Sequence, residues 1–415
     1  MIEARPWWIE LVGVTTNFNF KWQPFSNGIR YDLLNASNCK QAVNHLEFHA
    51  ELSAKSNLFI NLQNYSEINK ENVFNYLPIT FFITINPNKP NGQLLNAIHN
   101  FTIFYNVLEN NKHLLNEKQQ DKKPNTANPL YPITFDKRNI HPYSRYTMPL
   151  SHFVGYNLWL LKPIDLNRGQ GIHVFHDIET LKSLIIKYCK KDNTIEGIDK
   201  ANRFIIQKYI EEPLLIEGRK FDIRVWVLIT HEQNCYFFKE GYLRTSSAEY
   251  KIDIDNLENK FVHLTNNAVQ KHSDKYGSFE DGNQMSFKAF QEYLDKTYPD
   301  RNISVRDDLM LTMKNLIRKT ILSTRKKLNS CLRKNTFELF GYDFIVDQEF
   351  NIWLIEANTN PCLEESSKLL KSFVPRMLDD AFKLTLDSMF PPLTQYGSVK
   401  NKYPVPDYDD DENMW

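Results

Sequence analysis

Cysteine is scarce in this chain of 415 residues, and its five copies are scattered without a CxxC pair. This argues against a disulfide scaffold and a zinc site, and it is typical of a reducing compartment. No charge is in excess, because 50 Lys and Arg balance 50 Asp and Glu, so no overall field indicates nucleic acid or a membrane as partner. The longest apolar run, residues 76–85, is far too short to span a bilayer, and the first residues show no signal-peptide pattern. We therefore expect a cytoplasmic protein that binds neither nucleic acid nor membranes.

Familiar catalytic patterns are missing as well. The chain has no Ser/His/Asp or Cys/His arrangement, no P-loop and no Rossmann fingerprint. It also lacks the HRD- and DFG-like set of a protein kinase. Hydrophobic residues make up 42% and aromatic residues 13% of the chain, as in a folded globular protein. The length predicts two or three subdomains.

The pattern of elements divides the chain into five parts. Residues 1–109 predict an N-terminal domain of short strands and a helix, and the polar, Pro- and Asn-rich residues 110–150 predict a linker or surface loop. Residues 151–210 predict a central lobe with a glycine loop, and residues 211–393 a C-terminal lobe with a strand hairpin. Residues 394–415 predict a frayed acidic tail. Helices are expected at 177–191 (with Asp177 as N-cap), 286–296, 307–332 and 365–390.

Three oxygen-bearing side chains mark a β-hairpin between residues 337 and 363. Asp343 opens one apolar strand, and Glu356 and Asn358 close the next. Mg²⁺ prefers oxygen ligands, takes one or two carboxylates from a protein and completes its shell with water and phosphate. The hairpin therefore predicts a magnesium site.

The register of this hairpin supports that prediction. If residues 348–351 form the loop, Asp347 pairs with Ile352, and Asp343 falls directly opposite Glu356. Opposed residues of an antiparallel pair project on one face, about 5 Å apart at Cβ, where two like charges repel unless a cation lies between them. The alternative is an edge hairpin whose acids are solvated.

A row of charges on strand 220–230 is a second candidate. Lys220, Asp222 and Arg224 share one face by period two, opposite an apolar face. Such a row is either a solvated edge or a site where cations meet phosphates, for which Arg offers bidentate recognition. Lys162, at the end of an earlier strand, is a further phosphate candidate or merely a surface lysine.

Loops and strand ends supply the remaining candidates. The loop with Arg168, Gly169 and Gly171 allows close backbone approach to phosphate, although it could be only a hairpin turn. Residues 207–210 end a strand, where backbone groups could read an adenine edge. His263, Thr265 and Asn266 are polar residues of a predicted loop, and the lone His263 is interpreted as structural.

Several motifs in order resemble one family. LWLLKP, NRGQGI, IIQKYIEEPLLI, RKFDIRVWVLI, HLTNNAVQK, FGYDFIVD and WLIEANTNP resemble the tubulin tyrosine ligase and tubulin ligase-like (polyglutamylase and polyglycylase) family, continuously over residues 157–363. NHLEFHAELSAKSNLF resembles its N-terminal domain less sharply.

The resemblance implies an α+β fold of the ATP-grasp type, with nucleotide between two α+β lobes and a smaller N-terminal α/β domain. It implies ATP and Mg²⁺ as cofactors and ligation of a free amino acid (Glu, Gly or Tyr) to a carboxylate of an acidic tubulin tail through an acyl phosphate. It also implies a cytoplasmic protein of the cytoskeleton, cilium or basal body.

Roles carried over from the family fall on matching positions. The implied nucleotide-binding residues are Lys162, Arg168, Gly169, Gly171, Gln207, Lys208, Tyr209, Ile210, Lys220, Asp222 and Thr265. The implied catalytic residues are Arg224, Arg244 and Asn266, and the implied metal ligands are Asp343, Glu356 and Asn358.

The donor amino acid stays open at this stage. FKEGYLRTSSAEY and KYGSFEDGNQMSFKAFQEYL look closest to the tyrosine ligase, whereas ANTNPCLE looks more like the polymodifying ligases. Two alternatives remain: an ATP-grasp ligase acting on a non-tubulin acceptor, and a tubulin-binding protein that has lost catalysis.

Overall fold

The computed structural model describes residues 5–13, 17–34, 40–86, 90–120, 143, 146, 148–164, 166, 169–190, 201–254, 257–392 and 403–415. Its strands are β1 (Phe20–Lys21), β2 (Ala42–Val43), β3 (Thr80–Thr84), β4 (Trp159–Pro163), β5 (His173–Phe175), β6 (Arg203–Lys208), β7 (Leu215–Ile216), β8 (Arg219–Thr230), β9 (Cys235–Glu249), β10 (Gln284–Ser286), β11 (Phe337–Val346) and β12 (Ile352–Thr359). Its α-helices are α1 (Tyr31–Leu34), α2 (Ala50–Ser53), α3 (Lys55–Ile68), α4 (Pro90–Ala97), α5 (His99–Gln120), α6 (Ile178–Lys190), α7 (Lys260–His263), α8 (Asn267–Gln270), α9 (Phe287–Thr297), α10 (Met310–Thr324), α11 (Lys368–Leu384) and α12 (Leu386–Met389).

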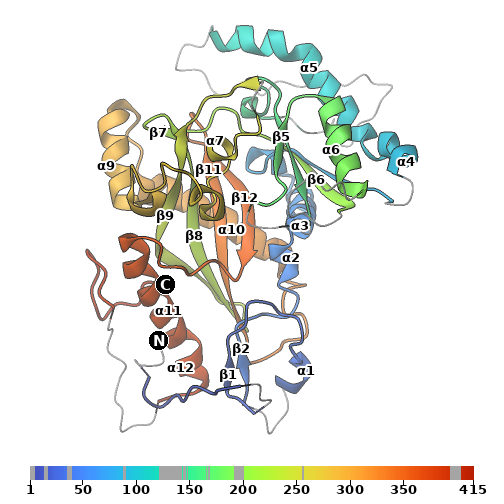
Figure 1. Ribbon diagram of the computed structural model, residues 1–415. Coiled ribbons are helices and arrows are strands. Elements are labelled where there is room, and N and C mark those ends of the chain that lie inside the picture. Colours follow the sequence, from blue (N-terminus) through green and yellow to red (C-terminus); the bar gives the residue numbers. More distant parts are fainter. Residues whose placement is uncertain are drawn as a thin grey trace.

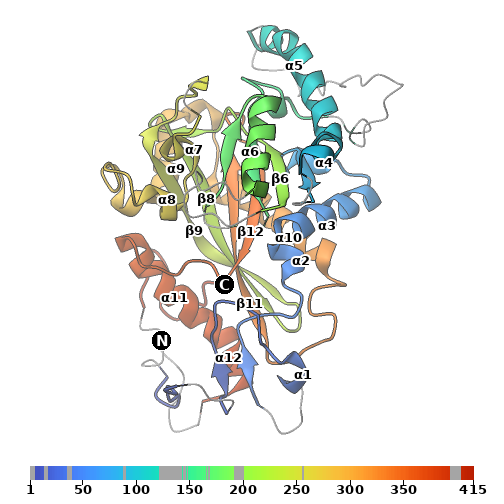
Figure 2. The same cartoon turned by 45° about the vertical axis from the view of Figure 1, so that its right-hand side comes forward.

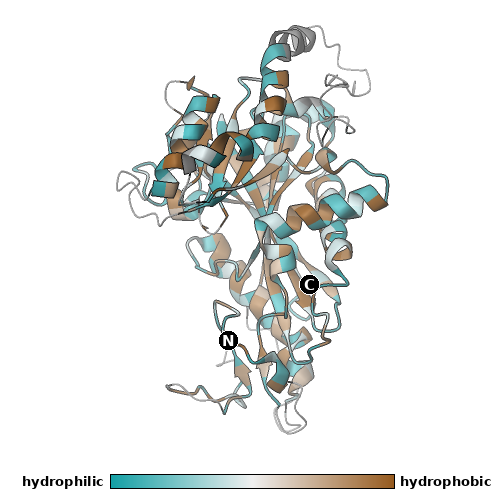
Figure 3. Cartoon of the chain, turned by 90° about the vertical axis from the view of Figure 1, so that its right-hand side faces the viewer, coloured by the Kyte–Doolittle hydropathy of each residue, from teal (hydrophilic) through white to brown (hydrophobic). Residues whose placement is uncertain are grey.

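Two antiparallel sheets organise most of these elements, and β1 and β2 form a separate parallel pair, which together confirm the predicted α+β class (Figure 1). The larger sheet has the order β10-β9-β8-β11-β12, with β7 beside β8, and the smaller has the order β3-β6-β4-β5. In Figure 3 the strands in the middle of the molecule are mostly hydrophobic, and the surrounding helices alternate hydrophobic with hydrophilic residues. None of the described helices is both long and apolar enough to cross a bilayer.

Helices cover the two faces of the larger sheet differently. On one face, Phe221 of β8 stacks edge-on against Phe290 of α9, and the Tyr342 hydroxyl of β11 lies 2.8 Å from Thr320 of α10. On the other face, Trp226 shares a core with α11, which lies beside the lower half of the sheet (Figure 2). The upper half of that second face is left to meet the smaller sheet, and the charged row of β8 lies there.

The smaller sheet draws on two of the predicted domains. Residues 80–84, assigned by sequence to the N-terminal domain, form edge strand β3 and pair with β6. Phe101 of α5 packs against Phe81 and Trp159 on this sheet. Helix α5 runs to Gln120, so the prediction of a loop is wrong for residues 110–120, and residues 121–142 lie outside the described residues.

Most predicted helix starts hold within a few residues. Asp177 caps α6, because its carboxylate accepts a hydrogen bond from the Thr180 N–H at 2.7 Å. The helix predicted at 307–332 ends at Thr324 instead, and the one predicted at 365–390 is divided into α11 and α12 at Thr385.

The turn of the β11–β12 hairpin is longer than predicted. Val346, rather than Asp347, pairs with Ile352. The Asp347 side chain turns inward and accepts hydrogen bonds from the backbone N–H groups of Glu349 (3.0 Å) and Asn351 (2.9 Å). The predicted pairing of Asp347 with Ile352 is therefore wrong by one residue.

A β-bulge restores the register farther along the same hairpin. Phe344 pairs with Leu354, whereas Asp343 pairs with Glu356, so Ile355 is the extra residue. Asp343 consequently lies opposite Glu356, as predicted, although the turn that was to place it there differs.

Replacing Asp347 by Ala is expected to lower the free energy of unfolding by about 3 kcal/mol. Its carboxylate also accepts from the Trp353 indole N–H (3.0 Å) and the Ser151 hydroxyl (2.9 Å), so several donors would lose their acceptor at once. Urea denaturation measures the loss. The matched control is Glu349→Ala in the exposed part of the turn, and equal losses in both variants would contradict the role of Asp347.

Residues 403–415 are not the frayed end that the sequence predicts. Met414 is fully buried, and the Trp415 indole N–H donates to the Met377 carbonyl at 2.9 Å. The buried Arg376 of α11 donates to the carbonyls of Tyr403 (3.2 Å) and Asp409 (2.9 Å). The acidic side chains point outward while the backbone is held, so composition alone misjudged this segment.

His45 ties the N-terminal segment to β11. Its Nδ1 lies 2.9 Å from Glu338 Oε1, and its Nε2 lies 2.8 Å from the Gln23 carbonyl oxygen. A carboxylate and a carbonyl both accept, so both ring nitrogens donate and His45 is an imidazolium. Burial lowers the pKa of His45, but Glu338 outweighs burial and the pKa is raised overall.

Stability is expected to fall as pH rises through the raised pKa of His45. A raised folded-state pKa means that this contribution is fully present below about pH 6.5, the unfolded value, and is lost above the folded value. Urea unfolding between pH 6 and 9 would measure the slope, and Glu338→Gln should remove it. The exposed His272, changed to Gln, is the control, and an unchanged slope in Glu338→Gln would rule out the charged pair.

Candidate functional site

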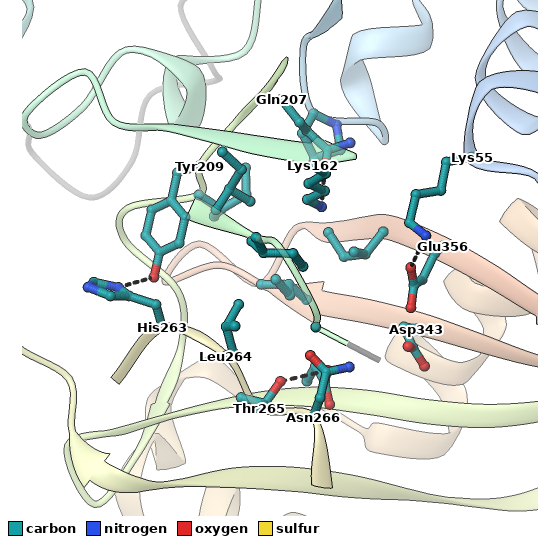
Figure 4. Close-up of a pocket in the computed structure, with 18 of the residues that line it drawn as sticks. Lys55, Lys162, Gln207, Tyr209, His263, Leu264, Thr265, Asn266, Asp343 and Glu356 are labelled. Carbon is teal, nitrogen blue, oxygen red and sulfur yellow. Dashed lines mark hydrogen bonds and ion pairs between the residues drawn. The ribbon is translucent and has the colours of Figure 1, made fainter. Parts of the chain in front are cut away.

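A cleft between the two sheets collects most of the predicted site residues (Figure 4). It holds about 930 Å³ of space, counting the part open to solvent. The predicted residues that line it are Lys162, Gly169, Gln207, Lys208, Tyr209, Ile210, Lys220, Asp222, Thr265, Asn266, Asp343, Glu356 and Asn358. Arg168 lies outside the described residues, and Gly171, Arg224 and Arg244 do not line the cleft.

Two arginines lie beneath Asp343. Arg224 holds both carboxylate oxygens of Asp343, at 2.5 and 3.0 Å, and Arg244 approaches one of them at 2.9 Å. Burial opposes ionisation of Asp343, but the attraction of the two guanidinium groups prevails and lowers its pKa to about 2. Asp343 is therefore ionised, and the arginines reach the cleft through it.

The three predicted metal ligands converge at one wall. Asn358 Nδ2 lies 2.9 Å from Glu356 Oε1 and 3.4 Å from Asp343 Oδ2, so its amide bridges the two acids. Turning the amide over would present its oxygen instead, a choice set by the surrounding hydrogen bonds. A set of only oxygen donors fits a hard cation such as Mg²⁺.

Lys55 is a site residue that the sequence analysis missed. It begins α3, and its Nζ lies 3.7 Å from Glu356 Oε2, across the cleft from Thr265 and Asn266 (Figure 4). The available signal was its place in NHLEFHAELSAKSNLF, which only weakly resembled the family. The side chain adds a cation beside the three predicted metal ligands.

Two lysines are buried in the cleft and form no ion pair within the part of the chain that the structure describes. Lys162 Nζ donates to Gln207 Oε1 at 2.7 Å. Lys220 Nζ donates to the Tyr209 hydroxyl at 2.9 Å and the His263 carbonyl at 3.1 Å. Their partners among the described residues are thus neutral.

Burial strongly lowers the pKa of both lysines. It lowers the pKa of Lys162 to about 8 against the opposing pull of Glu356, and the pKa of Lys220 to about 7 against that of Asp222. Repulsion between the two ammonium groups lowers the pKa of Lys220 further. Both positions favour an anionic ligand, which would restore the charged forms.

Lys208 differs from these two. Its Nζ forms a buried ion pair with Glu211 at 2.6 Å and donates to the Leu158 carbonyl at 2.8 Å. Glu211 also accepts from the Leu158 N–H at 2.6 Å, so the pair joins β4 to the end of β6. Lys208 reaches the cleft, but its charge is already compensated within the protein.

The two glycines of the predicted loop have different environments. Gly169 has φ +78°, and a Cβ there would lie 3.1 Å from Val269 and 3.4 Å from Asn266 Oδ1, so the loop lies against the Asn266 wall. Gly171 has φ +69°, and a Cβ there would lie 2.8 Å from the hydroxyl of Tyr188 on α6, away from the cleft. Only Gly169 is placed to approach a ligand in the cleft.

Asp222 organises the wall that carries the remaining polar residues. It accepts from Arg244 at 2.7 and 2.6 Å and from the Thr265 hydroxyl at 2.7 Å. His263, predicted to be structural, lies at the same wall of the cleft. Its Nδ1 accepts from the Tyr209 hydroxyl at 3.0 Å, and burial together with nearby Lys220 lowers its pKa to about 4.

Fold and site together define an α+β protein whose cleft joins buried cations to a set of convergent oxygen donors. The chain belongs to the Tubulin-tyrosine ligase family, whose sequence model matches residues 33–395. The resemblance inferred from the motifs is thereby confirmed.

Relatives within the family carry several names. Tubulin glycylase 3B of Tetrahymena thermophila is 35% identical over 256 residues, which is 61% of this chain and 20% of the relative. Probable alpha-tubulin polyglutamylase Ttll1 of the same species is 31% identical over 233 residues, 55% of this chain and 54% of the relative. Tubulin glycylase 3A of Drosophila melanogaster is 31% identical over 284 residues, 66% of this chain and 26% of the relative. The chain thus spans about a fifth to a quarter of these glycylases and about half of the polyglutamylase.

Proposed function

We propose that this protein is an ATP- and Mg²⁺-dependent ligase of the ATP-grasp type, which joins a free amino acid to a carboxylate of tubulin. The observation that carries the proposal is the pair of buried lysines, Lys162 and Lys220, neither of which forms an ion pair with a carboxylate among the described residues. They face the same cleft as Asp343, Glu356 and Asn358. A polyphosphate would supply the missing negative charge, and its phosphates would complete the shell of a cation held by the three oxygen donors.

The reaction proceeds in two balanced steps. An oxygen of the acceptor carboxylate attacks the terminal phosphorus of ATP, and the bond to ADP breaks, leaving an acyl phosphate. The amine of the free amino acid then attacks the acyl carbon, an amide bond forms, phosphate leaves and the amine releases a proton. Neither step needs a covalent bond to the enzyme, which agrees with the absence of a nucleophile arrangement in the sequence.

This chain's own residues act mainly by position and charge. Lys162 and Lys220 bind the polyphosphate, and the strand end at 207–210 receives the adenine. Asp343, Glu356 and Asn358 would hold Mg²⁺, which would neutralise charge on the transferred phosphoryl group. Arg224 and Arg244 fix Asp343 in its ionised form, and Thr265 and Asn266 form the opposite wall.

Tubulin is the proposed acceptor because the relatives named above are tubulin glycylases and a probable alpha-tubulin polyglutamylase. The proposed donors are Gly, Glu and Tyr, and the proposed location is the cytoplasmic cytoskeleton, including the cilium or basal body. The competing functions are ligation to another protein acceptor and tubulin binding without catalysis.

Intact-mass spectrometry of tubulin tails tests the proposal. Tubulin is incubated with the protein, Mg²⁺-ATP and a mixture of Gly, Glu and Tyr. The expected result is a mass increment that identifies the donor, and its multiplicity distinguishes single addition from chain elongation. ATP consumption with no increment on tubulin would favour another acceptor, whereas tubulin binding without ATP turnover would favour the non-catalytic function.

ATP binding is expected to take up protons above about pH 7. Lys162 and Lys220 are partly neutral in the free cleft at pH 8.5, because burial lowers their pKa values to about 8 and about 7. Bound phosphate favours the protonated forms, so ATP affinity should fall as pH rises through this range. Titration calorimetry at pH 8.5 in two buffers of different ionisation enthalpy measures the uptake, and identical heats in both would contradict it.

A further inference from the structure

A basic surface lies on the side of the larger sheet that faces away from the cleft. Residues 309–336 contain eight Lys and Arg and no Asp or Glu. The chain as a whole has equal numbers of both signs, so this segment is locally cationic in an otherwise neutral protein. Most of it is helix α10.

Five exposed side chains on α10 and at its C-terminal cap form one stripe. Leu311, Lys314, Arg318 and Leu322 of α10 and the cap residue Arg325 recur at intervals of three and four residues, so they share one face. We call these five residues the α10 stripe. Leu311 is 55% and Leu322 37% exposed, so the stripe contains two apolar side chains among three cationic ones.

Nearby acids do not neutralise this stripe. Glu71 pairs with Lys319, and Glu51 pairs with Lys327, but both lysines lie beside the stripe. Among the residues that the structure describes, Arg318 and Arg325 form no ion pair. Lys314 lies over the Phe237 ring, 5.0 Å from its centroid. The stripe therefore keeps unneutralised positive charge at the surface.

The stripe and the cleft lie on opposite faces of the sheet. Tyr342 points to α10, where its hydroxyl meets Thr320, whereas the next residue, Asp343, lines the cleft. Packed layers are about 10 Å apart, and ten extended residues reach about 33 Å. A flexible tail can therefore enter the cleft while the folded part of the same acceptor rests on α10.

We infer that the α10 stripe is a docking surface for an acidic face of the folded acceptor protein, separate from the cleft that modifies its tail. This inference rests on the proposed function. Charge complementarity selects an acidic partner. The exposed leucines favour a folded protein over a simple polyanion, since protein interfaces combine an apolar core with arginine.

Kinetics on two acceptors test the inference. The variant Arg318→Glu/Arg325→Glu is compared with wild type on polymerised tubulin and on a synthetic peptide with the sequence of its tail. The matched control is Lys187→Glu/Lys190→Glu, which reverses two exposed charges on α6 of the other lobe. The stripe variant should raise KM for polymerised tubulin roughly ten-fold and leave KM for the peptide and for ATP within about two-fold, and the control should change neither.

Other outcomes overturn the inference. An unchanged KM for tubulin, or an equal loss on tubulin and peptide, would show that the stripe is not a separate docking surface. Reversal that abolishes binding to anionic vesicles or RNA while tubulin kinetics stay normal would assign the stripe to another partner. If wild type modifies neither acceptor, the proposed function fails instead, and co-sedimentation of the two variants with polymerised tubulin decides the inference by itself.

Discussion

Glu356→Gln is expected to lower kcat for ligation roughly a thousand-fold or more, with the fold intact. The substitution removes a negative charge from the proposed magnesium site with little change in volume. Glu356 is only part-buried. It accepts from the Asn358 amide, lies 3.7 Å from Lys55 and attracts the Lys162 ammonium. The structure therefore gives little reason for a loss of stability, and the effect should fall on ligation, through the proposed magnesium site and the charge of Lys162.

Single-turnover ligation with intact-mass detection measures this effect, and thermal unfolding checks the fold. The matched control is Glu349→Gln, an exposed acid in the turn of the same hairpin, which should ligate as wild type does. Retained activity in Glu356→Gln would remove the hairpin from the reaction and leave the lysines as the only support for the proposal.

Lys220→Met should raise KM for ATP roughly a hundred-fold while leaving the protein as stable as wild type or more so. Methionine keeps most of the packing of the stem against the Tyr209 ring, which lies 4.2 Å from the ammonium. It also removes a buried charge that burial disfavours, as the lowered pKa of Lys220 shows. Opposite signs for stability and nucleotide binding are typical of a residue kept for function.

Equilibrium binding of ATP and urea denaturation provide the two readouts for this variant. Lys251→Met, at an exposed position just after β9, serves as the control. If the variant bound ATP as tightly as wild type, the charged row Lys220, Asp222 and Arg224 would be only a structural feature of the strand.

The larger elements of the fold could be predicted from alternation and caps. Strand β8 shows why the surroundings could not. The pattern predicted one apolar and one charged face, and a solvated edge remained possible, yet all twelve residues of β8 are buried. Burial of the charged face depends on the smaller sheet and α11, which come from distant parts of the chain.

The residues that line the cleft could be predicted better than the interactions that they form. Motif spacing brought Lys162, Lys220 and the three predicted metal ligands together in one cleft, because all of them lie on strands of the two sheets that line it. The ion pair of Lys208 with Glu211 escaped prediction, since nothing in a single strand indicates which lysine meets a buried acid. Lys55 escaped because it comes from a helix that reaches the cleft only through tertiary packing.

The bulge at Ile355 has a consequence for how this chain tolerates change. The extra residue lies between the turn and the Asp343–Glu356 pair. It shifts the strand register by one residue, and without this shift Asp343 would not pair with Glu356. Relatives could gain or lose a residue near the turn and keep the pair opposed by losing or gaining one at the bulge. An alignment that starts at the turn and allows no gap would then match Ile355, instead of Glu356, to the acid of such a relative. Gaps in this hairpin should therefore be placed according to the strand pairing.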